Sequence, residues 1–235
     1  METNNMNDNQ VFDVEVLNKG LHREGVFATR SFNRGELIFA EPVVVSYELT
    51  KKDMNSPGTD ALFLVRHILE NKDARSEFKS LELKAIPGVF EKPKKSENHA
   101  LRKLSKSLPY SHEQIIRCWQ IVSTYFIIAR HTNDVKNSAA TKEYSFIRCQ
   151  LSHFHSKINH SCSPNARPTA VFKSKESYFD KSAPLFASKK ISAGEEITFS
   201  YMMQPEFSYL PVLTRQKVLQ QNYHFKCVCK KCLAE

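Results

Sequence analysis

Residues 158–165 of this 235-residue chain read Ile-Asn-His-Ser-Cys-Ser-Pro-Asn. It brings together polar side chains at Asn159 and His160 and a thiol at Cys162. Ser161 adjoins His160, but catalytic triads are recognised by how their members meet in space, so adjacency in sequence carries no weight. The stretch alone therefore does not indicate a hydrolase.

A second cluster of functional side chains lies near the C-terminus. Cys227, Cys229 and Cys232 follow a C-x-C-x2-C spacing. Thiolates this close together readily converge on one tetrahedral zinc ion at about 2.3 Å, and three sulfurs leave a fourth position to be filled. Cys162 and His224 are the leading candidates for that position. We expect a closed, structural zinc site, which pins the tail to the body of the protein.

Both ends of the chain show the pattern of short β-strands. Residues 11–17 and 195–201 alternate apolar and polar side chains, which is typical of half-buried strands. Further short β-rich segments are predicted at residues 25–30, 36–39 and 43–47, and strand character returns after residue 144.

The middle of the chain is predicted to be helical. Residues 60–70 have helical apolar spacing, and residues 111–130 are predicted to form one helix that opens with a capping box of Ser111 and Gln114. The basic stretch 92–107 is interpreted as an exposed helix face or linker in preference to a nucleic-acid patch. With a last helix over residues 212–222, the order of elements indicates a mostly β, α+β fold, because strands and helices do not alternate regularly.

Composition narrows the class of protein. The chain is 41% hydrophobic and 25% charged, which excludes disordered and collagen-like classes. The longest apolar run, residues 121–129, is shorter than the roughly 20 residues of a membrane span, and residues 1–10 lack the apolar core of a secretory signal. We therefore expect an intracellular protein, nuclear or cytoplasmic, that is not secreted and has no membrane partner.

The charge balance bears on partners. Lys and Arg number 34 against 25 Asp and Glu, giving a net charge of +9. Such a charge favours association with acidic partners such as nucleic acid, and says nothing about fold.

Three motifs in order resemble the SET-domain protein lysine methyltransferases. They are Asn-His-Ser-Cys-Ser-Pro-Asn at 159–165, Ala-Gly-Glu-Glu-Ile-Thr-Phe-Ser-Tyr at 193–201, and Tyr-x-Phe-x-Cys-x-Cys-x2-Cys at 223–232. The chain is most similar to the SET-and-MYND branch. Because no cysteine precedes residue 118 and the sequence given ends three residues after Cys232, the MYND finger and the C-terminal helical lobe of that branch are expected to be absent.

The resemblance implies a β-clip-like SET fold with a knot-like crossing. It divides the chain into a disordered N-terminus at 1–10, the first part of the SET domain at 11–50, a largely helical insertion at 51–143, the second part at 144–202 and a zinc-binding post-SET segment at 203–235.

The same resemblance assigns roles to individual residues. Tyr201 would be the catalytic tyrosine and would also touch S-adenosylmethionine, Phe225 would stack on the adenine of that cofactor, and Phe199 would line the lysine channel. Cys162 would complete a structural Zn²⁺ site. The remaining cofactor-binding residues would be Asn159 and His160 together with Arg23, Glu24 and Gly25, which form a cofactor-facing loop where Arg23 replaces the usual first glycine.

The implied activity is S-adenosylmethionine-dependent methylation of a lysine ε-amine in a protein or peptide, with histones among the candidate substrates. Two alternatives stay open at this point. One is a catalytically inert SET module that binds protein partners, and the other is a zinc-stabilised protein that binds nucleic acid through the basic insertion. The oligomeric state is not predicted.

Overall fold

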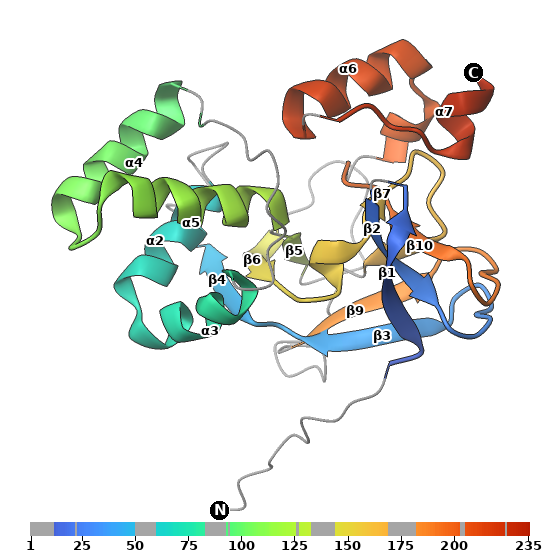
Figure 1. The fold of residues 1–235 in the computed structure, drawn as a ribbon, viewed down its shortest axis with the longest axis horizontal. Helices are drawn as coiled ribbons and strands as arrows, with labels where there is room; N and C mark the ends of the chain where they lie inside the picture. Colours follow the sequence, from blue (N-terminus) through green and yellow to red (C-terminus); the bar gives the residue numbers. More distant parts are fainter. Residues whose placement is uncertain are drawn as a thin grey trace, which may run out of the picture.

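The structure is a computed structural model, shown in Figure 1. It describes residues 12–21, 23–49, 60–82, 93, 95–125, 127–132, 144–168, 182–202, 205–223 and 225–235. The predicted disordered N-terminus lies outside these residues, as does His224.

The first sheet brings together the N-terminal strands and two of the three motifs, those at 159–165 and 193–201. Its strands are β1 (Val14–Gly20), β2 (Arg23–Ala28), β10 (Glu196–Phe199) and β7 (Asn159–His160), in the order β1-β2-β10-β7. β10 pairs antiparallel with β2 and parallel with β7, which places Phe199 opposite His160. The motif at 159–165 and the segment that ends at Tyr201 are therefore neighbours in space.

Two further sheets complete the β part of the described chain. β3 (Leu37–Pro42), β9 (Ser182–Ala187) and β8 (Ala166–Pro168) form one, in the order β3-β9-β8. β4 (Val45–Leu49), β6 (Tyr144–Leu151) and β5 (Ile127–Thr132) form the other, in the order β4-β6-β5. Removal of apolar side chains from water stabilises this part of the fold, and its core includes the fully buried residues Val26, Phe32, Leu185, Ile191 and Ile197.

The insertion is a group of helices that packs on β4 and β6, on the left of Figure 1. It contains α2 (Asp60–Glu70), α3 (Lys72–Glu82), α4 (Lys95–Ser107) and α5 (His112–Tyr125). The predicted capping box is confirmed, because the Ser111 main-chain N–H donates to Gln114 Oε1 (2.9 Å) and the Gln114 N–H donates to Ser111 Oγ (3.2 Å). A second hydrophobic core lies here, built around Leu64, Val65, Ile68, Leu101, Ile115 and Val122.

The prediction of one helix over residues 111–130 is wrong beyond Tyr125. Residues 127–132 form β5, which pairs antiparallel with β6 so that Ile127 lies opposite Gln150 and Ile128 opposite Cys149. β-branched isoleucines favour strands when a partner strand is available, and such long-range pairing overrides a local helical pattern. Helix α3 was not predicted, because its sequence is strongly polar.

The C-terminal part gathers over one end of the first sheet. It comprises the 3-10 helix η2 (Pro205–Tyr209), α6 (Val212–Tyr223) and α7 (Lys230–Ala234), and Figure 1 shows α6 and α7 side by side near β7 and β10. A third core cluster holds this part in place, with Cys162, Phe207, Leu219, Cys227 and Cys229 buried together. Among the described residues, none of the helices has the length and apolar character required to cross a bilayer.

Candidate active site and metal centre

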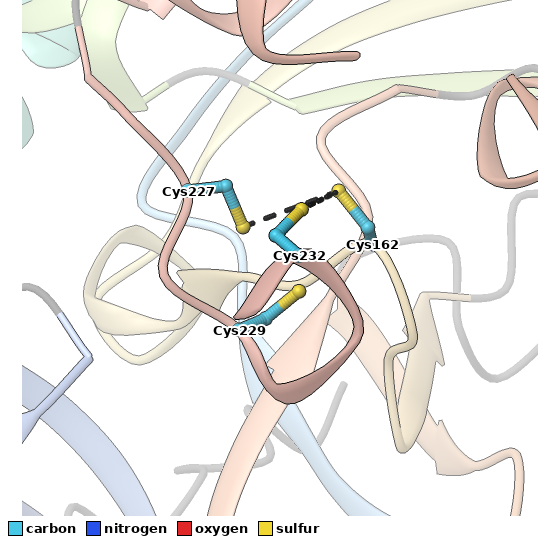
Figure 2. Close-up of side chains that lie close together, drawn as sticks. All are labelled: Cys162, Cys227, Cys229 and Cys232. Atoms are coloured by element: carbon cyan, nitrogen blue, oxygen red, sulfur yellow. Dashed lines mark hydrogen bonds between the residues drawn. The ribbon is translucent and has the colours of Figure 1, made fainter. Parts of the chain in front are cut away.

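Four cysteines meet between the turn after β7 and the C-terminal tail. Figure 2 shows the side chains of Cys162, Cys227, Cys229 and Cys232 directed toward one another, and their sulfur atoms all lie within 4.8 Å of one another. Cys162 Sγ is 4.0 Å from Cys227 Sγ and 3.5 Å from Cys232 Sγ. Four thiolates bound to zinc at 2.3 Å in a tetrahedron are about 3.8 Å apart, so this donor set fits Zn²⁺. Of the two leading candidates for the fourth ligand, the structure brings Cys162 to the other three.

Crowding of the sulfurs shifts the pKa values of Cys162 and Cys229 in opposite directions. Hydrogen bonds with Cys227 and Cys229, together with burial, raise the pKa of the Cys162 thiol. Hydrogen bonds from Cys162 and Cys227 instead lower the pKa of Cys229. A divalent cation at the centre would stabilise the thiolate form of all four residues, because its charge opposes their mutual repulsion.

Helix α6 supports this centre with two polar side chains. Arg215 is 1% exposed, and its guanidinium donates to Cys232 Sγ (3.5 Å), to Glu235 Oε2 (3.0 Å) and to the carbonyl of Leu210. Burial lowers the pKa of Arg215, but hydrogen bonds to Cys232, Cys162 and Glu235 more than offset that effect, so the residue stays charged. Gln216 exchanges two hydrogen bonds of 2.7 and 2.8 Å with the main chain of Cys227, which orients the start of the cysteine segment.

Beside the cysteines lies a cluster of aromatic rings centred on Tyr201. Its ring centroid is 5.3 Å from that of His160, 5.4 Å from Phe199 and 6.1 Å from Phe225. The Tyr201 hydroxyl donates to the main-chain carbonyl of Ile158 at 2.9 Å. The structure thus brings together four residues that the sequence analysis singled out from three separate segments.

His160 connects the aromatic cluster with the cysteines. Its side chain is fully buried, Nδ1 accepts a hydrogen bond of 3.0 Å from the main-chain N–H of Tyr201, and Nε2 lies 3.4 Å from Cys162 Sγ. The side chain is directed into the protein, so any contact with a cofactor would involve the main chain of this residue.

The segment Arg23-Glu24-Gly25 was expected to form a loop. The structure instead shows it as the beginning of strand β2. The antiparallel register places Arg23 opposite Gly20 on the neighbouring strand β1. A Cβ atom at Gly20 would lie 2.6 Å from Glu196 Oε1, and one at Gly25 would lie 2.5 Å from the same atom. The two glycines also approach each other closely, because a Cβ atom at Gly20 would lie 2.9 Å from the Cα atom of Gly25.

The hydrogen bonds of Glu196 within the site were not predicted from the sequence. Both of its carboxylate oxygens accept from the main-chain N–H of Leu21, at 3.0 and 2.9 Å, in the turn between β1 and β2. The side chain of Asn159 donates to Glu196 Oε1 and to the carbonyl of Glu24, both at 2.7 Å. Asn159 therefore acts through its side chain as a link between the β1–β2 turn and the motif at 159–165.

A buried hydrogen bond between Glu41 and His155 fixes the segment just before β7, and this pair was also missed. Glu41 and His155 are 2% and 3% exposed, and Glu41 Oε1 lies 2.7 Å from His155 Nδ1. The same carboxylate accepts from the main-chain N–H groups of Phe154 and His155, each at 2.7 Å. It thereby anchors the 3-10 helix η1 (His155–Lys157), which leads directly into Asn159 and His160. No local pattern signals this pairing, because 114 positions separate its members.

Comparison with protein families decides what these features mean together. A family model described as the SET domain matches residues 23–202, which is most of the chain. This chain belongs to the SET-domain family. The SET fold expected from the sequence is confirmed, and the motifs that suggested it are those that meet around Tyr201.

Relatives of this SET domain include named lysine methyltransferases. It is 41% identical over 78 residues to the histone-lysine N-methyltransferase ATXR2 of Arabidopsis thaliana, and this match covers 33% of the chain and 15% of the relative. It is 40% identical over 105 residues to the protein-lysine N-trimethyltransferase SMYD5 of Homo sapiens, covering 41% of the chain and 22% of the relative. The chain thus spans about a fifth or less of the length of these relatives. SMYD5 agrees with the expected SET-and-MYND branch.

Among solved structures, the SET domain of LSMT bound to lysine and AdoHcy is similar at 12% identity and a TM-score of 0.49, covering 93% of this chain and 54% of that one.

Proposed function

We propose that this SET domain is a protein-lysine N-methyltransferase that uses S-adenosylmethionine. The observation that carries the proposal is the meeting of Tyr201, Phe199, His160 and Phe225 beside one four-cysteine centre. The relatives' names add support, since ATXR2 and SMYD5 are both lysine methyltransferases.

The residues present fit the cofactor. Phe225 is half-buried, and its ring lies 5.8 Å from that of His160 and 6.4 Å from that of Tyr223, tilted by 55° and 51° against them. A partly exposed aromatic ring of this kind can stack on a purine. We assign the adenine to Phe225 and the adjoining contacts to the main chain of Asn159 and His160. S-adenosylmethionine, when bound, supplies an electrophilic methyl group on a positively charged sulfur.

The protein's own contribution is to deliver a neutral, aligned lysine amine. With an ordinary pKa of about 10.4, deprotonation of a lysine at pH 7 costs about 4 to 5 kcal/mol. The aromatic rings of Phe199 and Tyr201 would exclude water from an incoming ammonium, and such desolvation lowers the pKa of an amine.

Tyr201 would then orient that amine. Its hydroxyl proton is donated to the Ile158 carbonyl, so toward an incoming ε-amine the hydroxyl oxygen acts as an acceptor. Alignment of a nucleophile in this way contributes several kcal/mol to many enzymatic reactions. Phe199 carries no hydroxyl that could hold a water molecule, which would leave room for successive methyl groups.

The structural zinc ion is part of the same proposal. Cys162, Cys227, Cys229 and Cys232 would hold Zn²⁺ and thereby tie the motif at 159–165 to the C-terminal tail that carries Phe225. Metal binding would in this way complete the aromatic cluster.

The substrate is proposed to be a lysine in a protein or peptide, histones included. A methyl-transfer screen with radiolabelled S-adenosylmethionine against histones, ribosomal proteins and cell lysate tests this. Labelled protein that disappears with Tyr201→Phe supports the proposal. An inert SET module would show no transfer and, in calorimetry, no binding of millimolar S-adenosylmethionine.

Nucleic acid is a second candidate partner because one face of α4 is basic. Arg102, Lys103 and Lys106 on this helix are exposed. Binding through these side chains would weaken steeply as salt concentration rises, since it releases counterions. An affinity for DNA that does not change between 50 and 200 mM salt (about the range used for such tests) would dismiss this role.

A further inference from the structure

The hydrogen-bond partners of the buried His160 ring determine which of its two nitrogens carries the proton. The main-chain N–H of Tyr201 points at Nδ1, 3.0 Å away, and a main-chain N–H is only a donor. Nδ1 must therefore carry a lone pair, which places the ring proton on Nε2. Nε2 in turn lies 3.4 Å from Cys162 Sγ, within the distance of an N–H···S hydrogen bond.

The two contacts of the ring serve two different parts of the site. A zinc-bound Cys162 is a thiolate, which only accepts hydrogen bonds, so it matches the Nε2–H donor. The opposite edge of the ring holds the main chain of Tyr201, which has just left β10. Groups that hydrogen-bond to metal ligands orient those ligands and tune the affinity for the metal.

Packing holds the ring in this orientation. His160 is 0% exposed, and its ring lies 6.2 Å from Phe207 and 5.8 Å from Phe225, on the side of the C-terminal segment. A ring confined in this way has little freedom to exchange its two partners, because rotation would leave a buried N–H and a buried lone pair without hydrogen bonds.

We propose that His160 is a positioning residue that serves the metal centre and the methyl-transfer site with separate edges of one ring: its imidazole donates to the Cys162 thiolate and accepts from the Tyr201 main chain. The role of Tyr201 in this statement rests on the proposed function, whereas the two hydrogen bonds of the ring do not. One buried side chain thus orients a metal ligand and also fixes the main chain of the tyrosine.

Two amide variants each retain one of the two hydrogen bonds of the ring and remove the other. In His160→Asn the side-chain oxygen occupies the place of Nδ1 and retains an acceptor for the Tyr201 N–H, but the donor to sulfur is lost. In His160→Gln the amide nitrogen reaches the place of Nε2 and retains the donor to sulfur, but the acceptor is lost. Phe207→Leu is the matched control, because Phe207 packs on the ring without hydrogen bonds to it.

Two measurements read the contacts without any need for enzymatic turnover. The first is the thiolate-to-cobalt charge-transfer band of the Co²⁺-substituted protein, together with metal affinity by chelator competition. The second is hydrogen exchange of the Tyr201 amide, followed by NMR in the zinc-loaded protein. We expect His160→Asn to shift the band to longer wavelength and weaken metal affinity about tenfold or more, with slow Tyr201 exchange preserved. We expect His160→Gln to keep the band and speed Tyr201 exchange at least about tenfold.

The decisive result is that each variant changes one measurement only: His160→Asn the metal measurements, and His160→Gln the exchange of the Tyr201 amide. If both variants change both measurements together, or if neither variant changes either measurement, the assignment of two separate contacts to the ring is wrong. An equal effect from Phe207→Leu would likewise show that the ring acts only through packing. Absence of methyl transfer by the wild-type protein would reject the proposed function and leave these measurements of the two contacts intact.

Discussion

The side chain of Asn159 donates a hydrogen bond of 2.7 Å to Oε1 of Glu196, although 37 positions separate the two residues in the chain. The bond crosses from β7 to β10, and the same carboxylate holds the main chain of Leu21 in the β1–β2 turn. One acidic side chain thereby joins three segments that lie far apart in the sequence, one of which holds Asn159.

Replacement of Glu196 by glutamine tests this junction. Glutamine exchanges one acceptor oxygen for a donor nitrogen, which leaves either Leu21 N–H or Asn159 Nδ2 facing another donor. We expect the free energy of unfolding to fall by about 1 to 3 kcal/mol in urea denaturation and S-adenosylmethionine to bind more weakly in calorimetry. Glu206→Gln, at an exposed position, serves as the control. Unchanged stability and unchanged cofactor affinity in Glu196→Gln would count against the junction.

Gly25→Ala tests the close approach to the same carboxylate. The added methyl group would lie 2.5 Å from Glu196 Oε1, closer than real Cβ contacts allow, so the carboxylate must move away from Leu21. We expect a loss of about 1 to 3 kcal/mol in stability. The double variant Gly25→Ala, Glu196→Ala removes the clash, and its loss should be smaller than the sum of the two single losses. Strict additivity would show that the two side chains do not meet.

Tyr201→Phe tests the methyl-transfer tyrosine. Loss of the hydroxyl removes the group that would orient the amine, and we expect kcat to fall about 100-fold or more. The aromatic contacts remain, so affinity for S-adenosylmethionine in calorimetry should stay within about threefold. Tyr209→Phe is a suitable control because Tyr209 is 86% exposed. Full activity of Tyr201→Phe would remove this residue from the mechanism.

Cys162→Ser tests the metal centre. The purified wild-type protein should carry stoichiometric zinc by elemental analysis, and the serine variant should lose most of it, because three thiolates from one short segment make an open site. We expect a lower melting temperature and faster proteolysis of residues after 205. Cys149→Ser is the control: Cys149 is buried in the other core and lies outside the cysteine cluster, so this variant should lose stability and keep its zinc. Wild-type protein without zinc would contradict the assignment.

Much of the candidate site could be predicted from the sequence. The C-x-C-x2-C spacing of Cys227, Cys229 and Cys232 indicated a metal, since thiolates this close in sequence are close in any conformation. Helix 60–70 was predicted with its observed bounds, because its apolar spacing and its ends are local features. The three ordered motifs also indicated the family that the SET-domain match shows.

Tertiary structure alone decided which distant groups complete these local features. It selected Cys162 to join the other three cysteines, turned residues 127–132 into strand β5, and paired the buried Glu41 with His155. It also placed the close-packed glycine at Gly20, across the register from Arg23. The physical reason is the same in each case: helix periodicity and thiolate spacing act over a few residues, whereas strand register and burial of polar groups depend on partners that only the folded chain brings near.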